Sequence, residues 1–159
     1  KAVLLFEPVA FHLFKTTEPA LYQQVQQLSQ QMLNVSPKDA AELFIDYWQG
    51  EGYFRHLPDV MQQKLTTQVG KVAADFEALS AEPATLTDYA TAIHCPVLLL
   101  SGEQSQLSAQ RLATMLAGAL PCVEFQRVKT GHMGPVTDAE LVNSVLLEFI
   151  QRLAIANLG

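Results

Sequence analysis

His132 is the residue of this sequence whose type and setting best suit acid–base chemistry. It lies in the segment Gly131-His132-Met133-Gly134-Pro135, which follows an apolar stretch and precedes a helical one. Because the two flanking glycines lack a Cβ, the backbone can bring the imidazole close to another group at little steric cost. An imidazole titrates near neutral pH and can take a proton from a nucleophile, although a loop histidine bonded to a carbonyl group has the same surroundings. We therefore treat His132 as a candidate general base.

Other kinds of chemistry lack the residues that they need. The sequence contains no H-x-x-x-H, no H-E-x-x-H and no cysteine–histidine cluster, so we expect no metal site. It contains neither G-x-x-x-x-G-K-[ST] nor G-x-G-x-x-G, so we expect no phosphate-binding loop and no dinucleotide. Cys95 and Cys122 are best explained as buried thiols in a reducing compartment. The expectation is a cytoplasmic protein without cofactor.

Charge and hydropathy exclude several classes of partner. The 159 residues carry 16 acidic and 10 basic side chains, a formal net charge of −6. Nucleic acids and anionic membrane surfaces both need a basic footprint, so we expect neither as a partner. The apolar runs, such as residues 96–100, are far shorter than the roughly 20 residues of a membrane-spanning helix. We therefore expect a soluble, acidic globular protein.

Three apolar stretches predict the strands that would position His132. Residues 2–6 and 96–102 are continuous apolar runs, typical of parallel strands buried on both faces. Residues 123–128 alternate, as a strand nearer a sheet edge does. After the histidine segment, Thr137-Asp138-Ala139-Glu140 predicts a capping box and a helix with a wide apolar stripe through residues 141–153. Strands that alternate with helices in this way pair in parallel through right-handed crossovers.

The stretch between the first two predicted strands is helical almost throughout. Thr17 would cap a helix that runs to Leu33, and Ser36-Pro37 would start the next one. The inner face of the first helix is predicted by apolar residues at helical spacing: Leu21, Val25, Leu28 and Met32. We therefore expect a first core strand and loop over residues 1–16, a helical cap over 17–92, and a β-α-β-α core unit over 93–159.

Several of these motifs together resemble the closing part of the α/β-hydrolase family. The resemblance is carried by Pro96-Val97-Leu98-Leu99-Leu100-Ser101-Gly102-Glu103, by residues 111–113, by Leu120-Pro121 and by residues 131–137. Residues 4–9 look like the strand that follows the family's nucleophile-bearing helix, and residues 46–52 fit its cap. The resemblance implies an α/β fold, with a partial parallel sheet of about three strands and a helical cap inserted between the first and second strand. It also implies that His132 is the catalytic histidine.

The acidic partner of the histidine departs from the family pattern. The usual position of the acid corresponds to Ser105, and a serine cannot hold an imidazolium as a carboxylate does. Glu7, at the carboxyl end of the first strand, and Glu103, in the turn after the second, are the two candidate replacements. We favour Glu7, for which a buried carboxylate bonded to backbone amides is the competing interpretation.

The predicted cap supplies most of the candidate substrate-binding residues. These are His12, Trp48, Tyr53, Phe54 and, beside the histidine, Met133. Aromatic side chains can form the wall of an apolar cavity, although packing within the cap accounts for them at least as well. A packed or surface histidine is an equal alternative for His12.

The family's nucleophile has no counterpart in this sequence. It lies in a G-x-S-x-G turn, and no such motif occurs in the 159 residues. The first residue is a lysine, and a predicted core strand follows at once, so we expect a piece of a longer protein. We expect the C-terminal fragment of a hydrolase of small, largely apolar esters or related substrates, inactive by itself. A non-catalytic ligand-binding or interaction module is the alternative, and in either case the bare edge of strand 2–6 predicts a homodimer.

Overall fold

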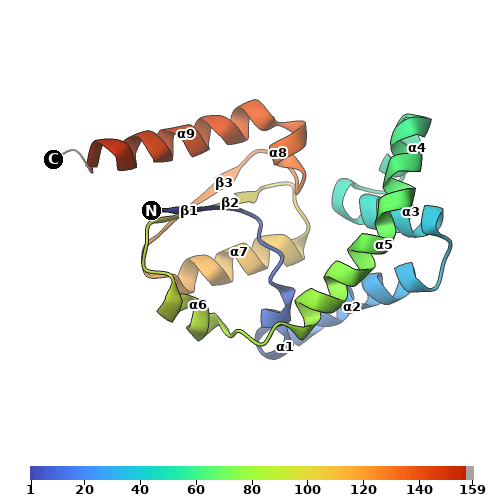
Figure 1. The fold of residues 1–159 in the computed structure, drawn as a ribbon, viewed down its shortest axis with the longest axis horizontal. Coiled ribbons are helices and arrows are strands. Elements are labelled where there is room, and N and C mark those ends of the chain that lie inside the picture. The colour runs from blue at the N-terminus through green and yellow to red at the C-terminus, as the bar shows by residue number, and fades with distance from the viewer. Residues whose placement is uncertain (157–159) are drawn as a thin grey trace. The chain divides into compact units, whose positions relative to one another are not determined.

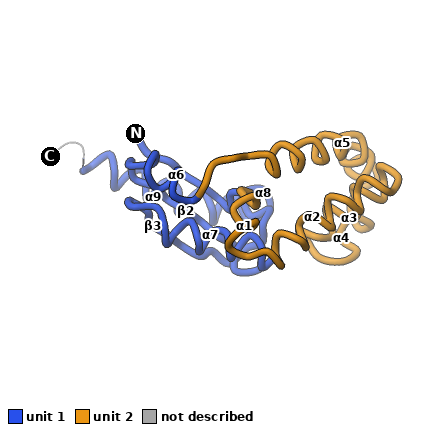
Figure 2. Tube along the Cα trace, turned by 90° about the horizontal axis from the view of Figure 1, so that it is seen from below, with its two compact units in different colours: residues 1–8, 86–159 blue, residues 9–85 orange. Residues whose placement is uncertain are grey.

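The computed structural model describes residues 1–156, and the chain forms two compact units (Figure 2). Residues 1–8 and the chain from Leu86 onward form the first, which we call the sheet unit. Residues 9–85 form the second, which we call the helical unit. The chain thus leaves the sheet unit after one strand and returns to it 77 residues later.

The sheet unit is a three-stranded parallel sheet with helices on both faces. Its strands β1 (Val3–Phe6), β2 (Val97–Gly102) and β3 (Val123–Val128) lie in the order β1-β2-β3. Its helices are α6 (Leu86–Ala92), α7 (Leu107–Ala119), α8 (Gly134–Thr137) and α9 (Ala139–Ala156). Figure 1 shows α7 on one face of the sheet and α9 on the other. This architecture confirms the predicted α/β fold with a partial parallel sheet of three strands.

The central strand forms the core, whereas β1 is less buried than its sequence predicts. All of β2 is buried, and Leu98 and Leu100 pack against Val142 and Phe149 of α9. The expectation that the first strand is buried on both faces is wrong for the described chain: Leu4 is 38% exposed. The reason is topological, because β1 lies at the edge of the sheet and has a neighbouring strand on one side only.

The helical unit consists of six helical segments in the described chain. They are the 3-10 helix η1 (Phe11–Leu13) and the helices α1 (Phe14–Thr17), α2 (Pro19–Leu33), α3 (Pro37–Gln49), α4 (Tyr53–His56) and α5 (Asp59–Ala81). A short turn at residues 50–52 connects α3 and α4. The predicted inner face of α2 is confirmed, because Leu21, Val25, Leu28 and Met32 are all buried.

The predicted helix start at Ser36-Pro37 agrees with the structure, whereas the predicted cap at Thr17 does not. Ser36 Oγ accepts a hydrogen bond from the Asp39 backbone N–H (3.2 Å) at the start of α3, and Gly50, with φ = +105°, ends that helix. Thr17 does not cap α2, which begins at Pro19. Its hydroxyl instead donates to the carbonyl oxygen of Leu13 (2.9 Å), because Thr17 is still inside the preceding helical turn.

The helical unit starts at Val9, whereas the sequence placed the start of the cap at residue 17. Aromatic packing accounts for the difference. The Phe11 ring stacks on Phe14 and on Trp48, with ring centroids 6.0 and 6.3 Å apart, so the segment after β1 belongs to the helical core. The assignment of the units as catalytic core and cap stays a prediction.

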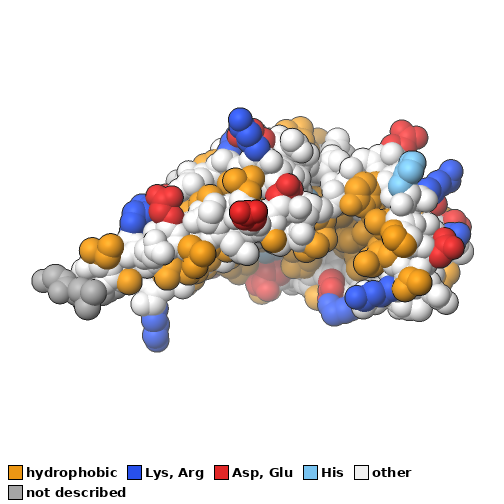
Figure 3. Space-filling view, turned by 90° about the horizontal axis from the view of Figure 1, so that it is seen from above, with side chains coloured by type: hydrophobic (Ala, Val, Ile, Leu, Met, Phe, Trp, Pro, Cys, Tyr) orange, Lys and Arg blue, Asp and Glu red, His pale blue; other side chains and the backbone are white. Residues whose placement is uncertain are grey.

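Two expectations about the segment after His132 are wrong. Gly134 and Pro135, expected to be part of a loop over residues 131–135, begin the short helix α8, and Thr137 ends that helix instead of capping α9. The apolar stripe of α9 is also narrower than predicted, since Leu141 and Ile150 are 40% and 48% exposed. Figure 3 shows apolar side chains exposed on the face of the sheet unit that carries α9.

Among the described residues, every helix is too short or too polar to cross a membrane.

Candidate catalytic site

A carboxylate–imidazole pair lies at the carboxyl edge of the sheet. Glu7 directly follows β1, and its backbone N–H continues the β1–β2 pairing by donating to the Leu100 carbonyl oxygen (3.0 Å). His132 follows β3 by four residues. Because parallel strands end at the same edge, the two side chains meet there, with Glu7 Oε2 2.8 Å from His132 Nδ1.

The strand between them fixes the second carboxylate oxygen. Glu7 Oε1 accepts hydrogen bonds from the backbone N–H of Gly102 (2.7 Å) and from the hydroxyl of Ser101 (3.1 Å). The Glu7 side chain is fully buried, whereas the His132 side chain is 17% exposed. The pair is therefore anchored in the sheet by its acid and reaches solvent through its imidazole.

Glu7 holds this position in an unfavourable backbone conformation. Its φ of +42° is the only positive φ of a non-glycine residue in the described chain. A left-handed conformation costs a non-glycine residue on the order of 1–3 kcal/mol and persists where the surroundings impose it, often at functional sites. The strain here accompanies three hydrogen bonds to one carboxylate.

The absence of a side chain at Gly102 allows the close approach behind the pair. A Cβ at this position would lie 2.4 Å from the Thr130 carbonyl oxygen and 2.6 Å from Ser105 Oγ. Thr130 belongs to the segment that carries His132, so the turn after β2 and the histidine segment touch through backbone atoms. The sequence pattern predicted only that Ser101 and Gly102 end a strand. It gave no signal for the hydrogen bonds that they donate to Glu7.

The electrostatic balance favours the ionised form of Glu7. Burial raises the pKa of this carboxyl group, but hydrogen bonding to His132 and the Gly102 amide, together with the nearby Ser105 hydroxyl, outweighs it, so the pKa lies below the ordinary value of 4.5. Of these groups, Ser105 contributes by proximity, since its buried Oγ makes no hydrogen bond of regular geometry. A carboxylate can only accept hydrogen bonds, and therefore His132 Nδ1 carries the proton that it donates to Glu7. In the neutral imidazole the lone pair is then on Nε2.

The other candidate acid lies apart from the histidine bond. The Glu103 side chain is exposed, and its backbone N–H pairs with the Val128 carbonyl oxygen (2.8 Å). Ser105, at the position where the resemblance to α/β-hydrolases places the acid, is buried beside Glu7, with 8% of its surface exposed. The structure thus brings Glu7, and not Glu103, into hydrogen-bond contact with His132. Met133, next in the chain, is 37% exposed.

The remaining candidates lie in the helical unit. His12 is buried, with its Nε2 3.0 Å from the Ala84 carbonyl oxygen, and Phe54 is completely buried. Trp48 is buried within a cluster of aromatic rings, with the Tyr47 ring centroid 4.8 Å away, while Tyr53 is 39% exposed. Burial of Trp48 and Phe54 favours the packing interpretation. A role of these residues in substrate binding stays a prediction.

No metal site is built by the residues that the structure describes: in the range 1–156, no three His, Cys, Asp or Glu side chains are grouped as ligands would be. The Glu7–His132 pair can hold an imidazole in one orientation and one tautomer for proton transfer.

The fold of the chain is that of the α/β-hydrolases. A solved esterase from Thermogutta terrifontis is 22% identical, with a TM-score of 0.65, over 95% of this chain and 56% of its own. The enol-lactonase from Burkholderia xenovorans is 18% identical with a TM-score of 0.66, over 95% and 56%. An α/β-hydrolase from a deep-sea metagenome library of the Medee basin is 17% identical with a TM-score of 0.67, over 95% and 56%.

The chain spans little more than half the length of these solved structures. No protein-family model matches the sequence, and no curated protein matches it. The similarity therefore establishes the fold, while the activity has to be argued from the site.

Proposed function

We propose that this chain is the C-terminal part of an α/β-hydrolase in which Glu7 and His132 form the acid–base pair. The observation that carries the proposal is the 2.8 Å hydrogen bond from His132 Nδ1 to the buried, ionised Glu7. In such a pair the carboxylate fixes the ring orientation and stabilises the imidazolium that forms during the reaction. Nε2 takes the proton of the attacking nucleophile and later gives it to the leaving group.

The nucleophile and the oxyanion donors of this reaction lie outside the chain in our proposal. No G-x-S-x-G turn occurs in the 159 residues, and the solved neighbours extend well beyond the region that the chain matches. Acyl transfer needs a nucleophile, a base and oxyanion donors within about 3 Å of one reacting atom, and the chain supplies only the base. We therefore expect the chain alone to be inactive.

The proposed substrate is a small, largely apolar ester or a related carbonyl compound. The esterase and the enol-lactonase among the structural neighbours support an ester-type substrate by their names. Met133, which is partly exposed and lies next to the proposed base, is the candidate contact for an apolar group in the sheet unit. A cytoplasmic location belongs to the same proposal.

The test compares the chain with the protein extended at its N-terminus by the preceding reading frame. Hydrolysis of p-nitrophenyl esters of increasing acyl length is measured for both, together with the His132→Ala variant of the longer protein. We expect turnover by the longer protein only, loss of turnover in His132→Ala, and a preference for short apolar acyl groups. Turnover by the 159-residue chain that His132→Ala abolishes would contradict the assignment, and a longer protein that binds esters without hydrolysing them would favour a non-catalytic binding module.

A further inference from the structure

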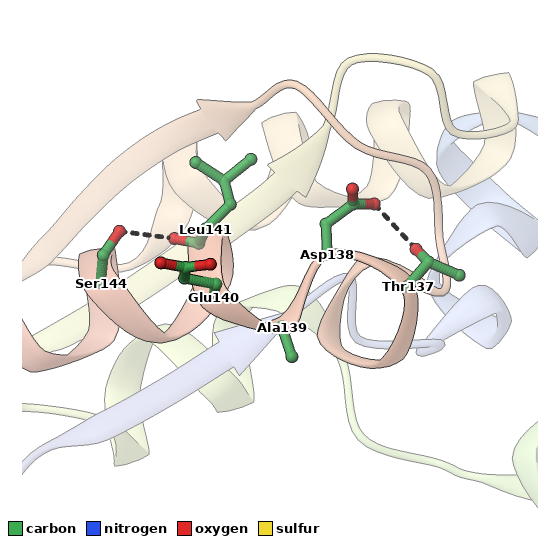
Figure 4. Close-up of a pocket in the computed structure, with 6 residues that line it drawn as sticks. All are labelled: Thr137, Asp138, Ala139, Glu140, Leu141 and Ser144. Carbon is green, nitrogen blue, oxygen red and sulfur yellow. Dashed lines mark hydrogen bonds between the residues drawn. The ribbon is translucent and has the colours of Figure 1, made fainter.

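A second carboxylate ties together the two ends of the segment that carries His132. The segment leaves β3 at Val128 and enters α9 at Ala139. Near its start, the Thr130 hydroxyl donates a hydrogen bond to Asp138 Oδ2, and Asp138 is the last residue before α9. The Thr137 hydroxyl donates to the same oxygen (2.8 Å), as Figure 4 shows in the turn between α8 and α9. We call the Thr130–Asp138 hydrogen bond the clasp.

One end of the clasp is anchored in the sheet unit. Thr130 is 1% exposed, its N–H donates to the Val128 carbonyl oxygen (2.8 Å), and its own carbonyl oxygen accepts from the Gln104 N–H (3.1 Å). Asp138 itself is exposed, and the hydroxyl of the buried Thr130 ties its carboxylate to the sheet unit. Hydrogen bonding to Thr130, and then to Thr137, lowers the pKa of Asp138, so its carboxylate is ionised at neutral pH.

Close packing inside the clasp leaves the segment little room to move. A Cβ at Gly134 would lie 2.4 Å from Thr130 Cγ2 and 3.1 Å from Phe6 Cζ. Within the segment, the Gly134 N–H donates to the Gly131 carbonyl oxygen (2.9 Å), and the Asp138 N–H donates to the Gly134 carbonyl oxygen (2.9 Å). These two bonds connect the clasp to the residue before His132.

We infer that Asp138 is a positioning residue for His132: through the Thr130 hydroxyl it closes the histidine segment and holds the imidazole against Glu7. Its importance for turnover rests on the proposed function, but the geometric effect does not. The competing explanation is that Asp138 only stabilises the first turn of α9, where a carboxylate is favourable. Removal of the Thr130 hydroxyl distinguishes these two explanations, because it breaks the clasp but leaves the Asp138 carboxylate at the start of α9.

The experiment uses the 159-residue chain and needs no turnover. An imidazole N–H that donates to a carboxylate gives a far-downfield proton resonance in the NMR spectrum, and its exchange with water reports how firmly the bond is held. The Nδ1 resonance is assigned by its loss in His132→Gln. Variants are Thr130→Val, which keeps the shape and removes the hydroxyl, and Thr130→Ser, which keeps the hydroxyl and removes the methyl group. Asp138→Ala and Asp138→Asn form the second pair, since asparagine retains an acceptor.

We expect the resonance to exchange about tenfold faster in Thr130→Val and Asp138→Ala, the factor that corresponds to one hydrogen bond of ordinary strength. Thr130→Ser and Asp138→Asn should remain close to the wild type. An unchanged exchange rate in Thr130→Val overturns the inference, as does an equal loss in Thr130→Ser, which would assign the effect to methyl packing against Gly134. Absence of the resonance from the folded wild-type chain overturns it too. A variant that fails to fold is replaced by the other member of the clasp.

The result is independent of the proposed hydrolase function. If the longer protein hydrolyses no ester but the clasp variants change the exchange rate, the positioning role stands and the proposed function fails. If the longer protein is active and the exchange rate does not respond to the clasp variants, the proposed function stands and the positioning role fails. In an active protein, Thr130→Val should lower kcat and leave KM near the wild-type value, because Thr130 is buried away from any substrate.

Discussion

Glu7 and His132 are 125 residues apart in the sequence, and their side chains are joined by a hydrogen bond of 2.8 Å. The acid directly follows the first strand of the sheet, and the histidine follows the third. The central strand β2 separates the two and contributes the Gly102 amide and the Ser101 hydroxyl that hold the carboxylate. The site is thus formed by three parallel strands that end at one edge.

Replacement of Glu7 by glutamine should abolish the function of the base in the longer, N-terminally extended protein. A side-chain amide can donate to Nδ1, which would move the ring proton to Nε2 and leave no lone pair for the nucleophile. By analogy with serine hydrolases, we expect kcat for a p-nitrophenyl ester to fall by about 10⁴-fold, with little change in KM. Steady-state kinetics of Glu7→Gln measures the effect.

Glu103→Gln distinguishes the two candidate acids in the same assay. The exposed Glu103 makes no contact with the histidine bond described above, so kcat should stay within a small factor of the wild-type value. A large loss in Glu103→Gln together with normal turnover in Glu7→Gln would reverse our assignment of the acid.

The ionised Glu7 should make the stability of the chain depend on pH in the acid range. The pKa of Glu7 is lowered in the folded chain because hydrogen bonds to His132 and Gly102, together with the nearby Ser105 hydroxyl, outweigh the effect of burial, while the unfolded chain has the ordinary value of 4.5. The unfolded state therefore binds the proton more tightly. The contribution of Glu7 to the free energy of unfolding is complete above about pH 4.5 and is lost as the pH falls through the folded-state pKa.

Urea unfolding at several pH values tests this dependence. At pH 7 we expect Glu7→Gln to lower the free energy of unfolding by about 1.5–3 kcal/mol, the range for hydrogen bonds to charged groups. As the pH falls from 4.5 through the folded-state pKa, the wild type should approach the variant, because Glu7 becomes protonated and both proteins then carry an uncharged side chain at position 7. Parallel curves down to pH 3 would show that the folded-state pKa of Glu7 is not lowered.

A methyl group at Gly102 should disrupt the contact behind the pair. The new Cβ would meet backbone, the Thr130 carbonyl oxygen at 2.4 Å, which cannot rotate away as a side chain can. We expect Gly102→Ala to destabilise the chain by about 1–3 kcal/mol, the usual cost of overpacking, as measured by thermal or urea unfolding.

Gly118→Ala provides the matched control for this substitution. Gly118 lies in α7, and a Cβ there has no neighbour within 4 Å. Because alanine is the better helix former, the control should be neutral or more stable by up to about 1 kcal/mol. Equal destabilisation by the two substitutions would mean that the Gly102 contact is not tight.

The bare edge of β1 should allow the chain to pair with a second copy. The N–H groups of Val3 and Glu7 bond to Pro96 and Leu100 at the β2 side. Since amides alternate along a strand, those of Leu4 and Phe6 point to the other side, where the described sheet has no further strand. We expect a concentration-dependent dimer, measured by size-exclusion chromatography with light scattering.

Leu4→Pro removes one of the outward donors and should yield a monomer, since proline is tolerated on edge strands but cannot donate to a ladder. The exposed Leu33→Lys in the helical unit controls for a general loss of apolar surface and should leave the dimer intact. The prediction is wrong if the wild type is monomeric at every concentration, or if the Leu4→Pro variant still dimerises.

Local patterns in the sequence predicted most of the elements. Three apolar runs gave three strands, and the spacing of Leu21, Val25, Leu28 and Met32 identified the buried face of α2, because these signals depend only on nearby residues. The same local logic failed at Thr17 and Thr137, neither of which caps the predicted helix: the Thr17 hydroxyl donates to the Leu13 carbonyl oxygen, and the Thr137 hydroxyl donates to the Asp138 carboxylate. A capping motif describes which bonds are possible, and the surrounding structure selects among them.

The residue types of the site were determined by the sequence alone: a histidine between two glycines after the last strand, and a glutamate at the end of the first. The sequence favoured Glu7 over Glu103 as the partner of His132, but only the tertiary structure supplied their hydrogen bond, the burial of the carboxylate and the cause of its lowered pKa. The physical reason is that the pairing order and register of the strands decide which strand ends meet, and this depends on contacts between residues far apart in the chain. The Thr130–Asp138 clasp has the same origin, since it forms only when β3, α8 and α9 are packed together.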